Sequence, residues 1–291
     1  MQKLVIEVRV NEYAMRDENP NVPWTPEEIA ADAAACEAEG ASIVHFHARK
    51  ADGSPAHDTE TYAEVIRRIR DRSAVLLHPT LGQITVAGTE SRLRHIKDLA
   101  ADAALRPELA SVDLGSTNID RYDAARRAFR STDGSYVNTV GTLVSFLRTF
   151  AELGVRPAVA CWAVPFVRTL EPFFDMGLLP TPTWVILVHT GDGVMAGHPP
   201  TPAGLRAFLD FLPADRPIAW TVASKPGNLF ANAAQAIQLG GHVSIGIGDH
   251  DYAELGAPTN AELVRRVVHL ARSMGREVAT PAETRALLEL S

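Results

Sequence analysis

The feature that most constrains the fold is a regular alternation of apolar, β-branched runs with segments of helical pattern along the chain. Such runs are typical of strands buried on both faces, as in a parallel sheet. They predict strands at residues 4–10, 42–48, 74–80, 109–115, 156–163, 183–190, 218–223 and 242–249. Strands that alternate with helices pair in parallel. Eight strand–helix units in 291 residues therefore predict an α/β fold, a (β/α)8 TIM barrel.

The predicted helices have clear end signals. The segment at 25–40 begins with a threonine N-cap and a proline, and it stops at a glycine. No Gly/Ser linker or charge block divides the chain, so residues 1–291 are expected to form one barrel domain with a C-terminal helix at 280–290. The alternative is a doubly wound open sheet, which favours a glycine-rich fingerprint after the first strand. Here that strand is followed by NEYAMRDENP.

Charge and cysteine content exclude several classes of partner. The net charge is −7 and no Lys/Arg run occurs, which argues against nucleic acid or an anionic membrane. No apolar run approaches the roughly 18 to 20 residues of a membrane-spanning helix. The amino terminus, MQKLVIEVRVNEY, alternates apolar and charged residues as a strand does, unlike a signal peptide. Two cysteines, Cys36 and Cys161, make no disulfide framework, so a cytoplasmic location is expected.

Two histidines share one face of the second predicted strand, in the segment SIVHFHARK at 42–50. Successive side chains of a strand point to opposite faces, so His45, His47 and Arg49 lie together. Two imidazoles two residues apart can reach one ion, which is a common start of a first-row metal site. Arg49 would add a fixed charge for an anionic substrate atom. The alternative is that these polar groups only bond to backbone at a strand end.

Further polar residues follow the other predicted strands, where a barrel of this kind carries its chemistry. Their convergence on one mouth indicates a site there. These residues are Glu12, His78, Thr80, Asp113, Ser116, Asn118, His189, Asp192, Ser224, Lys225, Asp249 and His250.

Several longer stretches resemble the β-keto acid cleavage enzymes, the family of 3-keto-5-aminohexanoate cleavage enzyme. They are VPWTPEEIAADAAACEAEGASIVHFHAR, PELASVDLGSTN, GGHVSIGIGD and NAELVRRVVHLARSMGREVATPAE. The resemblance implies a (β/α)8 barrel that binds a divalent metal, typically Zn2+, and forms a homo-oligomer, a tetramer. It also implies an acyltransferase that cleaves a C–C bond of a β-keto acid, a small carboxylate. Such an enzyme consumes acetyl-CoA and gives acetoacetate and an acyl-CoA.

The resemblance also implies roles for individual residues. His45 and His47 match the two metal-binding histidines of the family, and Asp249 matches the aspartate of its general base. Thr80 falls near a hydroxyl residue that contacts substrate. Glu12 falls near an acidic residue after the first strand.

The chain departs from the family pattern at three charged positions. The last strand of the family reads R-V-G-L-E-D-N, and here its metal-binding glutamate is Gly248 and its arginine is Ser244. The fifth predicted strand, with Ala160 and Trp162, has no acid where the family carries a glutamate near an aromatic residue. These losses predict a different substrate or reaction on the same scaffold, with a less cationic acyl group.

Three binding roles are expected of individual residues. Because Gly248 stands where the family has its metal-binding glutamate, the third metal ligand must come from another residue. His250 is favoured because a neutral imidazole suits zinc, and Asp249, Glu12 and His78 are alternatives. Arg49 is the expected clamp for the substrate carboxylate. The loop residues expected to hold a phosphate of acetyl-CoA ahead of a helix are Ser224, Lys225 and Asn228.

Two other functions stay open beside the acyltransferase. One is a metal-dependent aldolase or hydrolase that uses no CoA, and the other is a metal-bearing barrel that binds a ligand without catalysis. Dependence on the coenzyme separates the first from the acyltransferase. Turnover of any β-keto acid separates both enzymes from the binding protein.

Overall fold

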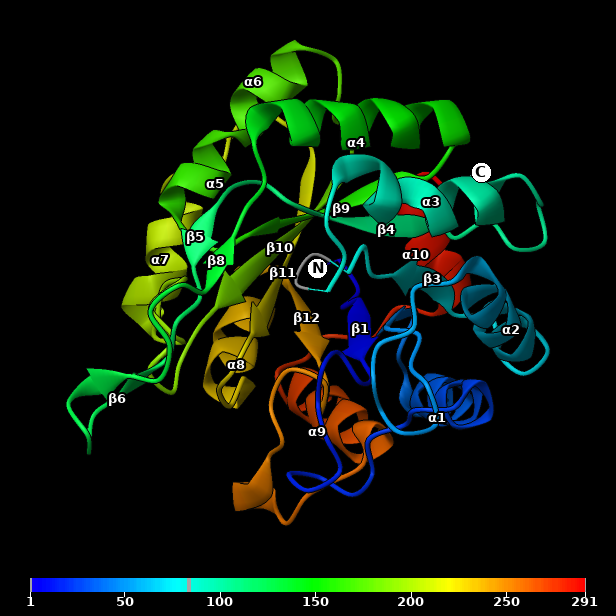
Figure 1. Cartoon of the computed structure of the whole chain (residues 1–291). Coiled ribbons are helices and arrows are strands. Elements are labelled where there is room, and N and C mark those ends of the chain that lie inside the picture. The colour runs from blue at the N-terminus through cyan, green and yellow to red at the C-terminus, as the bar shows by residue number, and fades with distance from the viewer. Residues whose placement is uncertain (1, 83–84, 291) are drawn as a thin grey trace.

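The computed structural model describes residues 2–82 and 85–290 and confirms the predicted barrel. Its strands are β1 (Ile6–Arg9), β2 (Ile43–Phe46), β3 (Leu76–Pro79), β4 (Leu109–Asp113), β9 (Arg156–Cys161), β10 (Thr183–His189), β11 (Ile218–Ser224) and β12 (His242–Ile245). They pair in parallel in the order β3-β2-β1-β12-β11-β10-β9-β4. Because β3 and β4, at the two ends of this order, contact each other, the sheet closes into a nearly complete barrel (Figure 1).

The helices form the outer layer around the strands (Figure 1). They are α1 (Pro26–Glu39), α2 (Thr59–Arg70), α3 (Thr89–Ala100), α4 (Val140–Leu153), α5 (Val164–Arg168), α6 (Leu170–Asp175), α7 (Pro202–Leu209), α8 (Phe230–Leu239), α9 (Asn260–Ser273) and α10 (Pro281–Leu287), with the 3-10 turn η1 (Ala253–Leu255). The predicted start of α1 is a full capping box: Thr25 accepts from the Glu28 amide, and the Glu28 carboxylate accepts from the Thr25 amide. No helix of the described residues is long and apolar enough to cross a bilayer.

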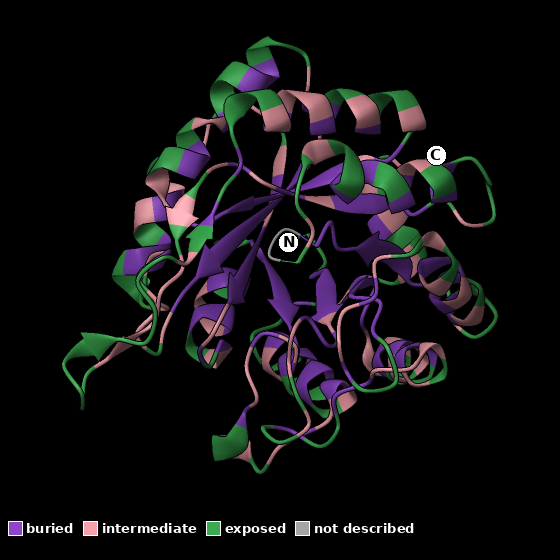
Figure 2. Cartoon of the chain, viewed as in Figure 1, coloured by how far each residue is buried: buried purple, intermediate pink, exposed green. Residues whose placement is uncertain are grey.

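Burial follows the expected layers (Figure 2). In α2 the residues at helical spacing, Tyr62, Val65, Ile66 and Ile69, are fully buried, while the arginines at its end remain outside. The strands are buried on both faces, as parallel strands under a helical layer must be. The apolar residues of the strands and the buried faces of the helices therefore form one core between the barrel and the helical layer.

The barrel interior also holds a polar group of residues that this packing seals from water. Glu7 on β1 is fully buried, and its carboxylate accepts from Ser244 and lies 2.6 Å from His78 Nδ1. His78 Nε2 is 2.8 Å from Ser111 Oγ. Burial raises the pKa of Glu7, but the neighbouring His78 outweighs it and holds the value at about 2. These bonds join β1, β3, β4 and β12 beneath the mouth of the barrel.

A long excursion separates β4 from α4, where the alternation predicts only a helix. It contains two short antiparallel pairs, β5 (Thr117–Asn118) with β8 (Ser135–Tyr136) and β6 (Tyr122–Asp123) with β7 (Ala128–Phe129). The β6 end projects away from the barrel (Figure 1). The returning segment brings Tyr136 back over the carboxyl end of β4.

Candidate active site

A pocket opens at the carboxyl ends of the strands, where barrels of this type carry their chemistry. Its polar lining includes Arg9, Glu12, His45, His47, Thr80, Ser111, Asp113, Tyr136, Trp162, Lys225 and Asp249. The predicted convergence of polar strand ends is therefore present, although not every predicted residue contributes to it.

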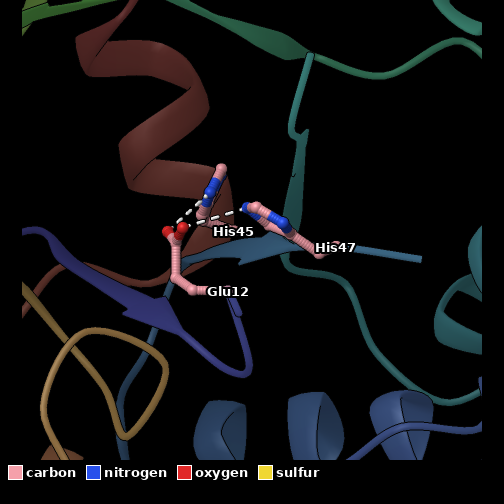
Figure 3. Close-up of side chains that lie close together, drawn as sticks. All are labelled: Glu12, His45 and His47. Carbon is pink, nitrogen blue, oxygen red and sulfur yellow. Dashed lines mark ion pairs between the residues drawn. The ribbon is translucent and has the colours of Figure 1, made fainter. Parts of the chain in front are cut away.

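Glu12, His45 and His47 form one buried cluster (Figure 3). The Glu12 oxygens lie 2.9 Å from His45 Nε2 and 3.0 Å from His47 Nε2. His45 Nδ1 lies 2.8 Å from the His78 carbonyl oxygen, so it donates there and leaves Nε2 with a free lone pair. His47 Nε2 is buried without a hydrogen bond among the described residues. One carboxylate and two imidazole nitrogens within 4.8 Å of one another suit a divalent ion.

The protonation states of these three residues also suit a metal. Burial, together with the charge of Arg9, lowers the pKa of His45 to about 3, and burial lowers the pKa of His47 as well. Burial raises the pKa of Glu12, but Arg9 and Lys225 outweigh it, so the pKa of this carboxyl lies well below its usual range. Neutral imidazoles and an ionised carboxylate are the forms that bind metals.

Glycines at the end of β12 make room for Glu12. A Cβ at Gly248 would lie 2.8 Å from the backbone of both Asn11 and Glu12. A Cβ at Gly246 would lie 1.9 Å from the Arg9 carbonyl oxygen. The chain after β1 thus occupies the space that side chains on β12 would otherwise fill.

Glu12 itself is held in an unusual backbone conformation. Its φ of 38° lies in the left-handed region, which is costly for a residue with a side chain. The Asn11 side chain donates to the His47 carbonyl and accepts from the His47 amide, each at 2.9 Å. Arg49 Nη1 donates to the Glu12 carbonyl at 2.7 Å. These bonds hold the Glu12 carboxylate beside the two histidines.

Asp249, Arg9 and Lys225 lie next to this cluster. Arg9 Nε is 2.6 Å from Asp249 Oδ2, and the same guanidinium also pairs with Glu12. Lys225 Nζ pairs with Glu12 and is 3.6 Å from Asp249 Oδ1, which is buried and accepts no hydrogen bond among the described residues. Burial, with Glu12 nearby, raises the pKa of Asp249 to about 6 despite the charge of Arg9. Asp249 therefore has a free oxygen and the raised basicity of a proton acceptor.

The structure does not bring His250, the favoured third metal ligand, to the histidine pair. His250 Nε2 lies 3.2 Å from Glu254 in a separate, more exposed group with Asp251. The His250 side chain therefore contacts η1, which contains Glu254, and not the two histidines. Glu12, one of the alternatives, takes the place beside His45 and His47.

Arg49 is also placed differently from its prediction as a carboxylate clamp. Its guanidinium donates to the carbonyl oxygens of Gly53, Glu12 and Ala14, at 2.6, 2.7 and 3.0 Å, and it does not line the pocket. Because these donors of Arg49 are bonded to backbone carbonyls, they are not available to bind a substrate carboxylate. Arg49 instead fixes the loop that carries Glu12.

The three residues predicted to bind a phosphate of acetyl-CoA also have separate surroundings in the structure. Lys225 points into the pocket, Asn228 donates to Glu254 at 2.7 Å, and the buried Ser224 hydroxyl donates to the Pro226 carbonyl at 3.4 Å. These three groups therefore do not form one anion site. Thr80 lines the pocket, as expected of a substrate contact.

Arg9 is a residue of the site that the sequence pattern does not single out. The pattern places it among the charged positions of an alternating strand, which usually face solvent. A strand inside a barrel has no solvent face, because one face meets the helices and the other the interior. A charged residue within a barrel strand is therefore a sign of a polar site, because a buried charge requires partners.

The close approach at Gly248 leads to a test. Gly248→Ala is expected to lower the free energy of unfolding by about 1–3 kcal/mol, because the new methyl group overlaps the backbone of Asn11 and Glu12. Gly141→Ala is the matched control, since its Cβ would meet only Thr139 Oγ1 at 3.8 Å and alanine favours the helix. Denaturant unfolding measures both. A Gly248→Ala protein as stable as the control would contradict the described packing.

Comparisons with known proteins agree with this geometry. The family model described as beta-keto acid cleavage enzyme matches residues 3–290. A 3-keto-5-aminohexanoate cleavage enzyme of Acetoanaerobium sticklandii is 32% identical over 295 residues, which cover 100% of both chains. The 3,5-dioxohexanoate:acetyl-CoA acetone transferase of Paraburkholderia graminis is 28% identical over 94% of this chain and 90% of its own. The solved apo structure of ObcA superposes with a TM-score of 0.73 at 18% identity, over 93% of this chain and 66% of that one, which supports the barrel fold.

Proposed function

Because this chain belongs to the β-keto acid cleavage enzyme family, we propose that it transfers the acyl part of a β-keto acid to coenzyme A. Acetyl-CoA is the co-substrate, as in the names of three relatives, a trimethylamine transferase and a 3-oxoadipate acetyltransferase among them. The products are acetoacetate and the acyl-CoA. The observation that carries the proposal is the free, buried Asp249 oxygen beside the Glu12–His45–His47 cluster in one pocket.

Three residues would hold a divalent ion, His45 and His47 through Nε2 and Glu12 through its carboxylate. The choice of zinc follows from the mixed nitrogen and oxygen ligands and from the family resemblance. When bound, the ion would polarise the keto oxygen of the substrate and stabilise negative charge that develops on it. Glu12 thereby replaces the glutamate that the family carries at the position of Gly248.

Asp249 acts as the general base. It removes a proton from C2, the carbon between the keto and carboxylate groups, and this carbon attacks the carbonyl of acetyl-CoA while the thiolate leaves. The thiolate then attacks the original keto carbon, its bond to C2 breaks, and Asp249 returns the proton to C2 of acetoacetate. Arg9, 2.6 Å from Asp249 Oδ2, would orient the carboxylate and leave Oδ1, which accepts no hydrogen bond among the described residues, to take the proton. Arg9 on β1 thus takes the role of the family arginine that is Ser244 here.

Lys225 and Thr80 bind the substrate carboxylate in this proposal, in place of Arg49. Lys225 is the one lysine that lines the pocket among the described residues, and its pKa is raised because Glu12 and Asp249 outweigh the effect of burial. The Thr80 hydroxyl follows β3 and lines the same pocket. A cationic group and a hydroxyl in this pocket would hold the carboxylate while C2 faces Asp249.

The assembly and location remain proposals that rest on the resemblance and composition. We propose a homotetramer located in the cytoplasm. Both cysteines, Cys36 and Cys161, are buried and free, which fits a reducing compartment.

The test is acetoacetate formation by the purified, zinc-loaded protein from acetyl-CoA and a panel of β-keto acids. Acetoacetate and an equal amount of the new acyl-CoA are expected, and both should disappear when acetyl-CoA is left out. Cleavage that continues without acetyl-CoA would favour the aldolase or hydrolase. Binding of a β-keto acid without any turnover would favour the non-catalytic barrel.

A further inference from the structure

We propose that the side of the pocket formed by β4 and β9 selects an acyl group with a positive charge or a strong hydrogen-bond donor, through the carboxylate of Asp113. This inference rests on the proposed function, because it specifies the substrate of the same reaction. It also reverses the expectation of a less cationic acyl group, which followed from the absence of an acid on the fifth predicted strand.

The strand register explains the reversal. Asp113, the last residue of β4, is the Cα partner of Ala160 on β9. Paired residues on neighbouring strands lie about 5 Å apart and point to the same face. The short Ala160 side chain therefore leaves space that the Asp113 carboxylate reaches from the next strand, and both residues line the pocket. The acid missing from β9 is supplied by β4.

Two donors hold the Asp113 carboxylate in place. Trp162 Nε1 donates to Oδ1 at 2.6 Å, and the Tyr136 hydroxyl donates to Oδ2. A carboxylate oxygen can accept two hydrogen bonds, so each oxygen keeps one acceptor position. Asp113 and the small residues Ser111, Ala158 and Ala160 all line the pocket, so a ligand there could approach the carboxylate. The carboxylate is thus oriented but not fully bonded.

The charges of the pocket also favour a cationic group on this side. Around the metal cluster, Arg9 and Lys225 balance Glu12 and Asp249. In contrast, no Lys, Arg or His nitrogen of the described residues lies within 4.0 Å of the Asp113 carboxylate. A second carboxylate on the substrate would be repelled here, and a purely apolar chain would bury the charge of Asp113 with only its two neutral donors, Trp162 and Tyr136.

The location fits the far end of a bound β-keto acid. Asp113 is the last residue of β4, and in the closed barrel only β3 separates β4 from β2, the strand that carries His45. The metal cluster and Asp113 line the same pocket, with Asp113 on its β4–β9 side. A substrate with its keto acid at the cluster would extend its acyl chain toward Asp113.

The experiment compares three six-carbon acids with acetyl-CoA: 3-keto-5-aminohexanoate, 3-ketohexanoate and 3-oxoadipate. The wild-type kcat/KM is expected to be about 10- to 100-fold higher for the amino acid than for the uncharged acid, the range of a hydrogen bond to a charged group, and lowest for the dicarboxylate. Asp113→Asn should remove this advantage, because kcat/KM should fall far more for the amino acid than for the uncharged acid. Tyr136→Phe is the matched control, because it keeps the charge and should keep the order of preference.

Three outcomes separate this inference from the proposed function. A wild type that prefers the uncharged acid or the dicarboxylate overturns the role of Asp113 while the acyltransferase stands. An Asp113→Asn protein that loses activity equally on all three acids also overturns it. If no acid yields acetoacetate the acyltransferase fails, and calorimetric binding of 5-aminohexanoate against hexanoate then decides the subsite. Equal binding of the two by the wild type would exclude it.

Discussion

Replacing Glu12 by glutamine is expected to lower the affinity of the protein for Zn2+ by about 100-fold or more, because residues that merely orient a metal ligand already contribute about 10- to 100-fold. The amide has the shape of the carboxylate but lacks its charge. His45 Nε2 and His47 Nε2 would remain in place, yet two neutral ligands hold zinc weakly. Metal content after dialysis and competition with a chelator measure the change.

His250→Ala is the control for that experiment, since it removes the ligand that the sequence pattern favoured. His250 contacts Glu254 and Asp251 outside the cluster, so this variant should bind zinc as the wild type does. Thermal unfolding of both variants shows whether the fold is kept. Wild-type zinc affinity in Glu12→Gln, or its loss in His250→Ala, would refute Glu12 as the third ligand.

Replacing Asp249 by asparagine is expected to reduce kcat for acetoacetate formation by about 10²- to 10⁴-fold, the usual contribution of a general base. The amide keeps the shape of the carboxylate beside Arg9 Nε, 2.6 Å from Oδ2 in the wild type, while the basic oxygen is lost. Zinc content should stay at the wild-type level, because Asp249 lies outside the Glu12–His45–His47 cluster. Steady-state kinetics with saturating acetyl-CoA provide the measurement.

Asp251→Asn is the matched control for this second prediction. Asp251 lies two residues further on, where its carboxylate accepts from the Ala253 amide at 3.1 Å, a bond that asparagine can also make. It should keep wild-type kcat. An Asp249→Asn enzyme within a few-fold of wild type would mean that another group removes the proton.

Much of the fold could be predicted from local patterns. The apolar runs, the Thr25–Glu28 capping box and the glycine after α1 all act over a few residues, so the strand–helix alternation is visible in the chain itself. The His45 and His47 pair follows from the same local rule, because side chains two apart on a strand share a face. These predictions needed no knowledge of which strands are neighbours.

The charges of the site depend on neighbours that the linear sequence does not show. Gly248 and Ala160 suggested that the site had lost its acids, and Ser244 that it had lost its arginine. The barrel places Glu12 against Gly248 and Asp113 beside Ala160, and it pairs Arg9 with Asp249. Spacing along the chain determines which face a side chain takes. Only closure and register determine which strand lies alongside, so only the tertiary structure could decide which residues supply these charges.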